Sequence, residues 1–257
     1  MQTVHFKDLG RMRYQEAWDY QTALHRNLVD NKLKNRQLPP KSYPQDHYLL
    51  LVEHPPVYTL GKSGSMDHLL LSEAELREKG IEFFPINRGG DITFHGPGQI
   101  VGYPILDLEC FFTDVHRYVR NLEEVIIRTL GEYGIKGFRI KDYTGVWTLN
   151  DGHETPDQPL GDVPDSGSRI QGLSSGVLKK ICAIGVHLSR WTTLHGWAFN
   201  VNTPLEYFHH IIPCGIAEED KTVTSLEQLL GHPVDLEEIK GKLKRHFAVV
   251  FDCEVVG

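Results

Sequence analysis

Cysteine is scarce in this chain of 257 residues, and the four that are present lie far apart, at Cys110, Cys182, Cys214 and Cys253. No C-x-x-C pair exists, which excludes the common zinc-binding patterns, and four scattered thiols do not make a disulfide scaffold. We therefore expect reduced thiols and a cytoplasmic protein. Each cysteine has to be judged by its own neighbours.

Long apolar runs are also missing. The longest run near the N-terminus covers residues 49–52, far too short to cross a bilayer, and the first residues show neither a signal core nor a transit pattern. The net charge of −7 argues against nonspecific nucleic-acid binding. We expect no membrane and no nucleic acid among the partners.

Motifs for nucleotide and metal chemistry are incomplete. A phosphate loop that ended in the GKS of residues 61–63 would need glycine at position 56, which is Pro56. Three histidines invite a metal hypothesis, but none has H-x-x-x-H or H-E-x-x-H spacing: His95, His187 and His195. We therefore expect no metal and no cofactor.

One serine motif does match. Residues 172–176, GLSSG, have the pattern of a nucleophile elbow around Ser174. That motif requires a strand before it and a helix after it, whereas here it follows a low-complexity stretch and precedes a strand. A serine hydrolase therefore stays open as an alternative.

Hydrophobic periodicity predicts helices over residues 14–33 and 115–130. Capping pairs predict three further helix starts, the first of which Gly80 ends: Ser72 with Glu75, Thr224 with Glu227, and Asp235 with Glu238. Apolar runs predict strands at residues 47–54, 81–88, 99–108, 180–188, 197–202 and 246–256. The run at 180–188 is apolar on both faces, so we expect it at the centre of a mixed α/β (α+β) fold.

The domain organisation follows from the composition. Residues 148–178 are rich in Gly, Pro, Asp and Ser and predict a long inserted surface loop. We expect a single catalytic domain over residues 1–257, with 215–257 as a small C-terminal subdomain.

The stretch NRGGDITFHGPGQIVGY, residues 87–103, concentrates polar groups and glycine between two apolar runs. Gly89 and Gly90 lack Cβ atoms and allow a ligand to approach the backbone, and Arg88 suits an anionic or carbonyl group. Thr93 alternates with apolar neighbours, as on a strand that shows polar groups to one side. A tight hairpin around Gly-Pro-Gly explains only part of the pattern, so we predict a ligand-binding loop.

Cys214 lies between proline and glycine, in IIPCGI, where a turn would expose its thiol. Cys182 lies among apolar residues and is expected to be an inert core residue. Lys180 begins the strand that is apolar on both faces, and a lysine beside a cysteine favours the thiolate. The sequence alone does not bring Lys180 to Cys214.

Several segments together resemble the lipoyl(octanoyl) transferase family. They are, in this order, EHPPVYTLG, RGGDITFHGPGQIVGYPILDL, KKICAIGV, HGWAFNVN and IIPCGI, and the resemblance spans about residues 48–216. It implies the catalytic domain shared with lipoate and biotin protein ligases, a mixed β-sheet flanked by helices. It also implies transfer of an octanoyl group from octanoyl-acyl carrier protein to a lysine of a lipoyl domain. The acceptors implied are the lipoyl domains of 2-oxoacid dehydrogenase complexes and the glycine cleavage H protein.

The same resemblance implies roles for particular residues. Cys214 is the acyl-thioester nucleophile, and Lys180 lowers its pKa. The residues at the family's substrate-binding positions are Arg88, Gly89, Gly90, Asp91, Ile92, Thr93, Phe94, His95, Ala183, Ile184, Gly185, Gly196, Trp197 and Ala198.

The long segment before KKICAIG departs from the family, in which this segment is usually short. Its acidity argues against contact with an acidic carrier protein, so basic side chains elsewhere are the expected contacts: Arg139, Lys141, Lys179 and Arg190. Two alternatives stay open besides the hydrolase. One is an ATP-dependent lipoate ligase on the same fold, which needs no cysteine, and the other is a noncatalytic acyl-binding relative.

Overall fold

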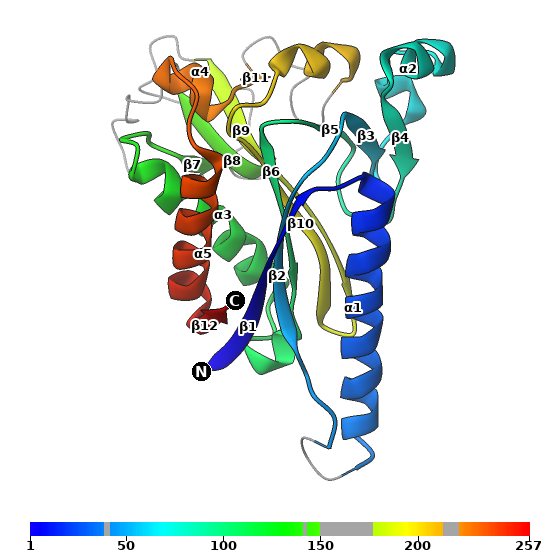
Figure 1. Ribbon diagram of the computed structural model, residues 1–257, viewed down its shortest axis with the longest axis vertical. Coiled ribbons are helices and arrows are strands. Elements are labelled where there is room, and N and C mark those ends of the chain that lie inside the picture. The colour runs from blue at the N-terminus through cyan, green and yellow to red at the C-terminus, as the bar shows by residue number, and fades with distance from the viewer. Residues whose placement is uncertain (39–41, 141–142, 150–176, 213–220) are drawn as a thin grey trace.

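The computed structural model describes residues 1–38, 42–140, 143–149, 177–212 and 221–257, most of them arranged around one large sheet (Figure 1). The strands are β1 (Gln2–Arg11), β2 (His47–Glu53), β3 (Val57–Leu60), β4 (Glu82–Pro85), β5 (Ile92–His95), β6 (Gln99–Ile105), β7 (Phe138–Ile140), β8 (Tyr143–Leu149), β9 (Leu178–Ser189), β10 (Thr192–Asn200), β11 (Lys221–Val223) and β12 (Cys253–Val256). The helices are α1 (Tyr14–Asn35), α2 (Glu73–Lys79), α3 (Val115–Gly131), α4 (Leu226–Leu230) and α5 (Leu236–Phe251), with 3-10 turns η1 (Met66–His68), η2 (Leu108–Cys110) and η3 (Leu205–His210).

The large sheet has nine strands in the order β12-β1-β2-β6-β10-β9-β8-β7, with β11 pairing β9 outside this path. The pairs β1–β12, β1–β2 and β9–β11 are parallel, and the remaining pairs are antiparallel. The β1–β12 pair joins Gln2 to Cys253, so the two termini lie side by side (Figure 1).

Strand β9 is the hub of this sheet. Its first half pairs with β8 and β11, and its second half pairs with β10, with Gly185 opposite Gly196. The expected central position of residues 180–188 is therefore confirmed.

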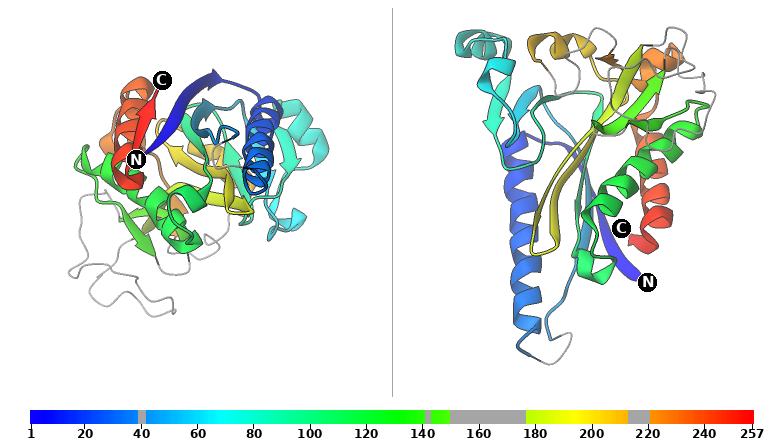
Figure 2. Two further views of the ribbon diagram at one scale, coloured as in Figure 1. Left: turned by 90° about the horizontal axis from the view of Figure 1, so that it is seen from below. Right: turned by 180° about the vertical axis from the view of Figure 1, so that it is seen from behind.

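Helices cover both faces of the sheet, as the two opposite views in Figures 1 and 2 show. On one face α3 and α5 pack together over a core that includes Leu122, Ile126, Leu243 and Phe247. On the other face α1 lies against β6 and β10, and its Ala17 and Leu28 join a second core. Among the described residues, no helix is both long and apolar enough to cross a membrane.

A small three-stranded sheet, β4-β3-β5, lies beside α1 (Figure 1). Its core brings Tyr58, Ile92 and Phe94 together with Phe208 of η3. This sheet carries the polar segment that was predicted to bind a ligand.

Several elements agree with the sequence prediction. The helices predicted at 14–33 and 115–130 are α1 and α3, and the strands predicted from 47, 99, 180 and 197 correspond to β2, β6, β9 and β10. The Ser72–Glu75 capping box is present, and Gly80 ends α2 in the left-handed conformation.

The strand predicted at residues 246–256 is wrong over its first half, because α5 continues to Phe251. Ile239, Leu243, Phe247 and Phe251 recur every four residues, so they form one buried helical face. Asp252 then adopts a φ of 49° and ends the helix, and only β12 is extended.

Two capping predictions need correction. The cap of α4 is Ser225, whose side chain accepts from the amide of Gln228, and not Thr224 with Glu227. Asp235 does cap α5, but its side chain accepts from the amide of Glu237, while the Glu238 carboxylate accepts from the Tyr133 hydroxyl.

The alternative of a tight hairpin around Gly-Pro-Gly does not hold. The turn forms, since the amide of Gln99 donates to Gly96 O at 3.2 Å. However, β5 belongs to the small sheet and β6 to the large one. The turn therefore passes the chain from one sheet to the other.

The C-terminal segment shares the main sheet and core. β11 pairs with β9, β12 pairs with β1, and α5 contributes to the same core as α3. Most of the predicted 148–178 loop lies outside the described residues, and its ends, at 148–149 and 178, belong to β8 and β9.

A buried ion pair fastens α1 to the rest of the fold. The Lys32 ammonium, on a side chain only 3% exposed, donates to Asp107 Oδ1 at 2.6 Å and to Arg190 O at 2.7 Å. Asp107 is 1% exposed and follows β6 closely, while Arg190 begins the turn between β9 and β10.

Replacing Lys32 with alanine would leave the Asp107 carboxylate buried without its cation. We expect Lys32→Ala to lower the free energy of unfolding by about 3–5 kcal/mol. Arg77→Ala removes an ion pair to Glu73 whose side chains are 77% and 92% exposed, and should change stability by no more than about 0.5 kcal/mol. Denaturant titration checks both, and equal losses would contradict the role of burial.

Candidate active site

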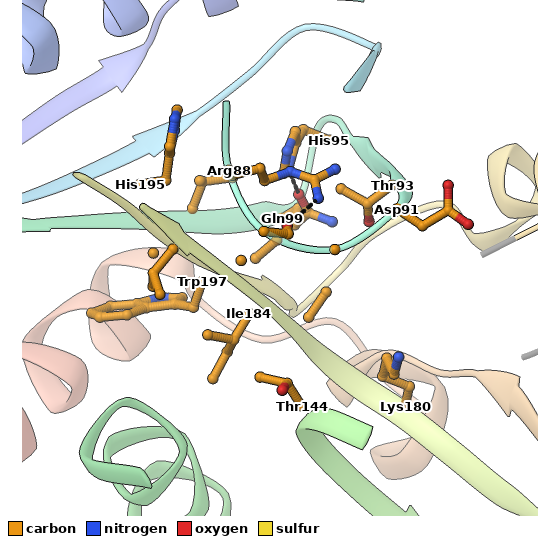
Figure 3. Close-up of a pocket in the computed structure, with 18 of the residues that line it drawn as sticks. Arg88, Asp91, Thr93, His95, Gln99, Thr144, Lys180, Ile184, His195 and Trp197 are labelled. Carbon is orange, nitrogen blue, oxygen red and sulfur yellow. Dashed lines mark hydrogen bonds between the residues drawn. The ribbon is translucent and has the colours of Figure 1, made fainter. Parts of the chain in front are cut away.

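A cavity of about 300 Å³ lies between the β9–β10 ribbon and the segment that leads into β5 (Figure 3). This volume is at the lower end of the roughly 300–1,000 Å³ typical of small-molecule sites. Of the substrate-binding residues predicted, those that line it are Arg88, Gly89, Gly90, Asp91, Ile92, Thr93, His95, Ala183, Ile184, Gly185, Gly196, Trp197 and Ala198, together with Lys180.

The polar segment lies directly on the ribbon. The amide of Gly89 donates to Val186 O at 3.0 Å, and a Cβ added at Gly185 would lie 2.8 Å from Gly89 O. A Cβ at Gly196 would lie 2.1 Å from Gly102 O on β6. Glycine at both positions lets the backbones approach this closely.

The Arg88 guanidinium donates hydrogen bonds within the protein, to Thr59 and Gly89. One nitrogen donates to Thr59 O at 2.6 Å and to Thr59 Oγ1 at 3.0 Å, and the other donates to Gly89 O at 2.9 Å. Because these donors serve the backbone of β3 and of its own loop, Arg88 shapes the cavity wall. The expectation that it grips an anionic group finds no support in these contacts.

His95 continues this network into the large sheet. The amide nitrogen of Gln99 donates to Phe94 O and Asn200 Oδ1, so its oxygen accepts from His95 Nδ1 at 2.8 Å. His95 Nε2 then accepts from the Thr59 hydroxyl, 3.3 Å away. The predicted alternation along β5 holds, because Thr93 and His95 line the cavity while Phe94 packs into the small core and stacks on Tyr207.

Burial keeps the histidines of this region neutral. His54 donates from Nδ1 to Met12 O and accepts at Nε2 from the Tyr103 hydroxyl, each at 2.8 Å. Burial lowers the pKa of His54 to about 4 and that of His95 well below its ordinary value. Burial, together with the charge of Arg88, lowers the pKa of His195 to about 3.

Lys180 lies at the opposite end of the cavity from His195 and Arg88 (Figure 3). Its ammonium is 4.6 Å from the centre of the Trp147 ring, which faces it from β8. Its carbonyl accepts from the amide of Thr224 at 3.0 Å, which fixes the strand at this point.

Cys214 lies outside the described residues, as do Lys141 and the GLSSG motif. The described chain stops at Ile212, whose amide donates to His68 O at 2.8 Å. It resumes at Lys221 in β11, where Val223 pairs with Lys180. Phe208 and Val223, on the two sides of this gap, both line the cavity.

Sequence reasoning missed several lining residues that come from distant elements. Tyr14 of α1 stacks parallel to His95 with 6.0 Å between ring centres, and Tyr103 and Asn200 extend the polar wall. Gln99 lies within residues 87–103, the predicted ligand-binding loop, and its position close to His95 and the Gly-Pro-Gly turn could have indicated that it lines the site. Tyr14 carried no such signal, since it is one apolar position among several on an amphipathic helix.

One of the basic residues proposed for carrier contact has an internal role, since Arg139 pairs with Glu123 at 3.0 Å and with Glu124 at 2.7 Å. Arg190 gives only its backbone carbonyl to Lys32, and the residue itself is exposed. Within the described part of the chain, no three His, Cys, Asp or Glu side chains gather in a way that could hold a metal ion.

The neutral histidines predict acid sensitivity. Their folded-state pKa values lie below those of the unfolded chain. Below about pH 6.5 the unfolded chain therefore binds more protons than the folded protein, and the stability decreases as the pH is lowered. We expect the free energy of unfolding to drop between pH 7 and pH 5, by up to about 1.4 kcal/mol per pH unit for each buried histidine.

Denaturant titrations of His54→Gln and Tyr103→Phe test this assignment. His54→Gln should reduce the slope with pH, because one titrating group is removed. Tyr103→Phe removes the hydrogen bond to the same histidine and should lower stability without reducing the slope. An unchanged slope in His54→Gln would count against the assignment.

Comparison with known proteins shows the family of this chain. Residues 13–248 match the model of the lipoyl protein ligase A/B catalytic domain. An octanoyltransferase of Flavobacterium psychrophilum is 50% identical over 99% of both chains, and one of Flavobacterium johnsoniae is 49% identical over 98% of both.

Solved structures agree on the fold. A bipartite lipoate protein ligase from Thermoplasma acidophilum, described with its E2 lipoyl domain, gives a TM-score of 0.63 at 14% identity, covering 100% of this chain and 88% of that one. Lipoate-protein ligase A bound with ATP gives 0.61 at 14% identity, covering 100% and 90%. The expected ligase-like fold is thereby confirmed, and the chain belongs to the lipoyl protein ligase A/B catalytic domain family and, within it, to the octanoyltransferases.

Proposed function

We propose that this enzyme transfers an octanoyl group from octanoyl-acyl carrier protein to a lysine of a lipoyl domain, through a thioester on Cys214. The observation that carries the proposal is the placement of Lys180 at one end of a cavity whose walls contain 13 of the 14 predicted substrate-binding residues. The similarity to octanoyltransferases supports the choice of octanoyl as the acyl group and of group transfer as the reaction class.

The first step is thioester exchange. The Cys214 thiolate attacks the carbonyl carbon of the octanoyl thioester, a C–S bond to Cys214 forms, and the C–S bond to the carrier breaks. The departing carrier thiolate takes a proton from the Lys180 ammonium. Lys180 favours the thiolate before this step because a nearby cation lowers a thiol's pKa.

The second step is aminolysis. The acceptor lysine loses one proton to the neutral Lys180 amine and attacks the acyl-Cys214 carbonyl. The amide forms, the C–S bond breaks, the Cys214 thiolate is regenerated, and the second amine proton leaves to solvent. Lys180 thus ends the cycle as an ammonium group, as it began.

The cavity wall suits an acyl chain. Val101, Ile184, Trp197 and Ala198 supply apolar surface, and Gly185 and Gly196 complete the wall without a polar side chain. Burying the methylenes of an eight-carbon chain contributes roughly 5 kcal/mol at about 0.8 kcal/mol per CH₂. The histidines beside this surface are kept neutral by burial and do not oppose an apolar ligand.

The acceptors in this proposal are the lipoyl domains of 2-oxoacid dehydrogenase complexes and the glycine cleavage H protein. A fold relative is described together with an E2 lipoyl domain, which supports this acceptor class. The proposal places the enzyme in the cytoplasm, and the unbridged state of Cys110, Cys182 and Cys253 fits a reducing compartment.

An ATP-dependent lipoate ligase is the second candidate, favoured only by the fold it shares with the ATP-bound ligase. That reaction activates a free acid and has no need of a cysteine at position 214. The two candidates therefore differ in the covalent state of the enzyme.

Intact-mass spectrometry after mixing with octanoyl-acyl carrier protein tests the proposal. We expect one octanoyl adduct on the wild type, and none on Cys214→Ala. Cys110→Ala is the matched control, since burial raises the pKa of Cys110 to about 11 and keeps it a thiol; it should load normally.

Lys180 variants separate its two roles. Lys180→Ala should slow loading by about 10²–10⁴-fold. Lys180→Arg keeps the cation but cannot accept a proton, so it should load faster than Lys180→Ala and still fail in transfer to a lipoyl domain. An adduct that persists in Cys214→Ala would overturn the assignment of the nucleophile, whereas no adduct on the wild type together with a reaction that requires ATP would favour the ligase.

A further inference from the structure

His195 has an unusual backbone for a strand residue. Four non-glycine residues in the described chain have positive φ, and three of them lie at a turn or a helix end: Arg190, Trp191 and Asp252. His195, with a φ of 62°, lies inside β10 and is 2% exposed. Side chains with a Cβ are disfavoured in this region, and such strain persists only where surrounding contacts hold it.

Two buried contacts hold His195 in place. Its backbone amide donates a hydrogen bond to Gln21 Oε1 of α1 at 3.1 Å, which fixes the backbone of His195 against this helix. Its ring Nε2 lies 2.8 Å from Asn87 Oδ1. Burial and the neighbouring Arg88 lower the pKa of His195, so the neutral ring donates from Nε2 to Asn87.

Asn87 is the residue before Arg88, so this contact reaches the cavity wall. The next tie is the bond from the Gly89 amide to Val186 O, and Val186 pairs directly with His195 in the ribbon. One side-chain bond and one backbone bond therefore fasten the start of the Arg88–Gly90 loop to neighbouring positions of β9 and β10.

The tie lies at the far end of the cavity from the proposed chemistry. Val186 is six residues along β9 from Lys180, which is about 20 Å at roughly 3.3 Å per residue. His195 and Arg88 lie together at this end, with Lys180 at the other (Figure 3).

We infer that His195 is a positioning residue, whose left-handed backbone aims its ring at Asn87 and thereby sets the separation between the Arg88–Gly90 loop and the β9–β10 ribbon. The inference rests on the proposed function only in assigning the cavity to an acyl chain. Loss of the tie loosens acyl binding and leaves the steps at Lys180 intact.

Three substitutions separate backbone strain from the contact. Gln can present its amide nitrogen where His presents Nε2, but it tolerates a positive φ poorly. Asn and Gly tolerate a positive φ, but Asn is too short to reach Asn87 and Gly has no side chain. His195→Gln should therefore keep the contact at the cost of backbone strain, while His195→Asn and His195→Gly lose the contact and relieve the strain, with a loss of stability that comes only from the space left by the buried ring.

The KM for octanoyl-acyl carrier protein should depend on whether the hydrogen bond between residue 195 and Asn87 is kept. We expect KM for the carrier to rise about tenfold in His195→Asn, His195→Gly and Asn87→Ala, as for one lost buried hydrogen bond, with kcat within about threefold. In His195→Gln, KM should stay within about threefold while Tm falls by ~2–4 °C. Asp252→Gly relieves a positive φ at the end of α5 and is the control that should leave KM unchanged.

Hydrogen exchange of residues 87–91 gives a readout that needs no activity. The Gly89 amide should exchange faster in His195→Asn and Asn87→Ala than in wild type and His195→Gln. Equal exchange and equal KM in all variants would overturn the inference, as would KM values that simply follow Tm. Failure of the wild type to load an acyl group would instead overturn the proposed function, and the exchange data would still decide the role of His195.

Discussion

The two sheets of this protein are joined by one continuous chain of buried hydrogen bonds, on which the shape of the cavity depends. It runs from Arg88 to Thr59, from Thr59 to His95, from His95 to Gln99 and from Gln99 to Asn200. Each bond fixes the donor and acceptor of the next, so the direction of every member is determined. Removing one member leaves a buried polar group without its partner, which costs more than the bond contributes.

This chain also explains why a wall so rich in polar residues encloses an apolar space. Arg88 donates to backbone oxygens, His95 is occupied by Thr59 and Gln99, and His54 bonds to Met12 O and Tyr103. These polar groups satisfy one another. The surface left for a ligand combines backbone, small and apolar side chains with further polar groups such as Asp91 and Thr93, and Lys180 lies at one end.

The sequence was sufficient for the strongly periodic elements and for most of the wall. The α1 and α3 patterns and the apolar runs of β2, β6, β9 and β10 depend on local spacing, which tertiary contacts did not override. The strand predicted at residues 246–256 was wrong because Val249, Val250 and Phe251 suit a strand or a buried helix equally. Only the four-residue spacing back to Ile239 shows that this segment is helical. The alternative of a hairpin at Gly-Pro-Gly is excluded only by the structure, because no local signal indicates that β5 and β6 enter different sheets.

Strand β1 and the contact between Asn87 and His195 were not predicted, because both depend on residues far away in the sequence. β1 has only one buried residue, Val4, so its alternation is weak, and its place in the sheet is set by strands that come much later. The proximity of Asn87 and His195, more than a hundred residues apart, likewise follows from the order of strands.

The parallel pairing of β1 with β12 sets the order in which this sheet can be completed. Residues 2 and 253 are neighbours across it, a separation that gives the fold a high contact order at this edge. During synthesis β1 can pair with β2 early, yet its outer edge stays open until residues 253–256 have left the ribosome. An unpaired edge recruits other strands, so the nascent chain is prone to association until β12 arrives.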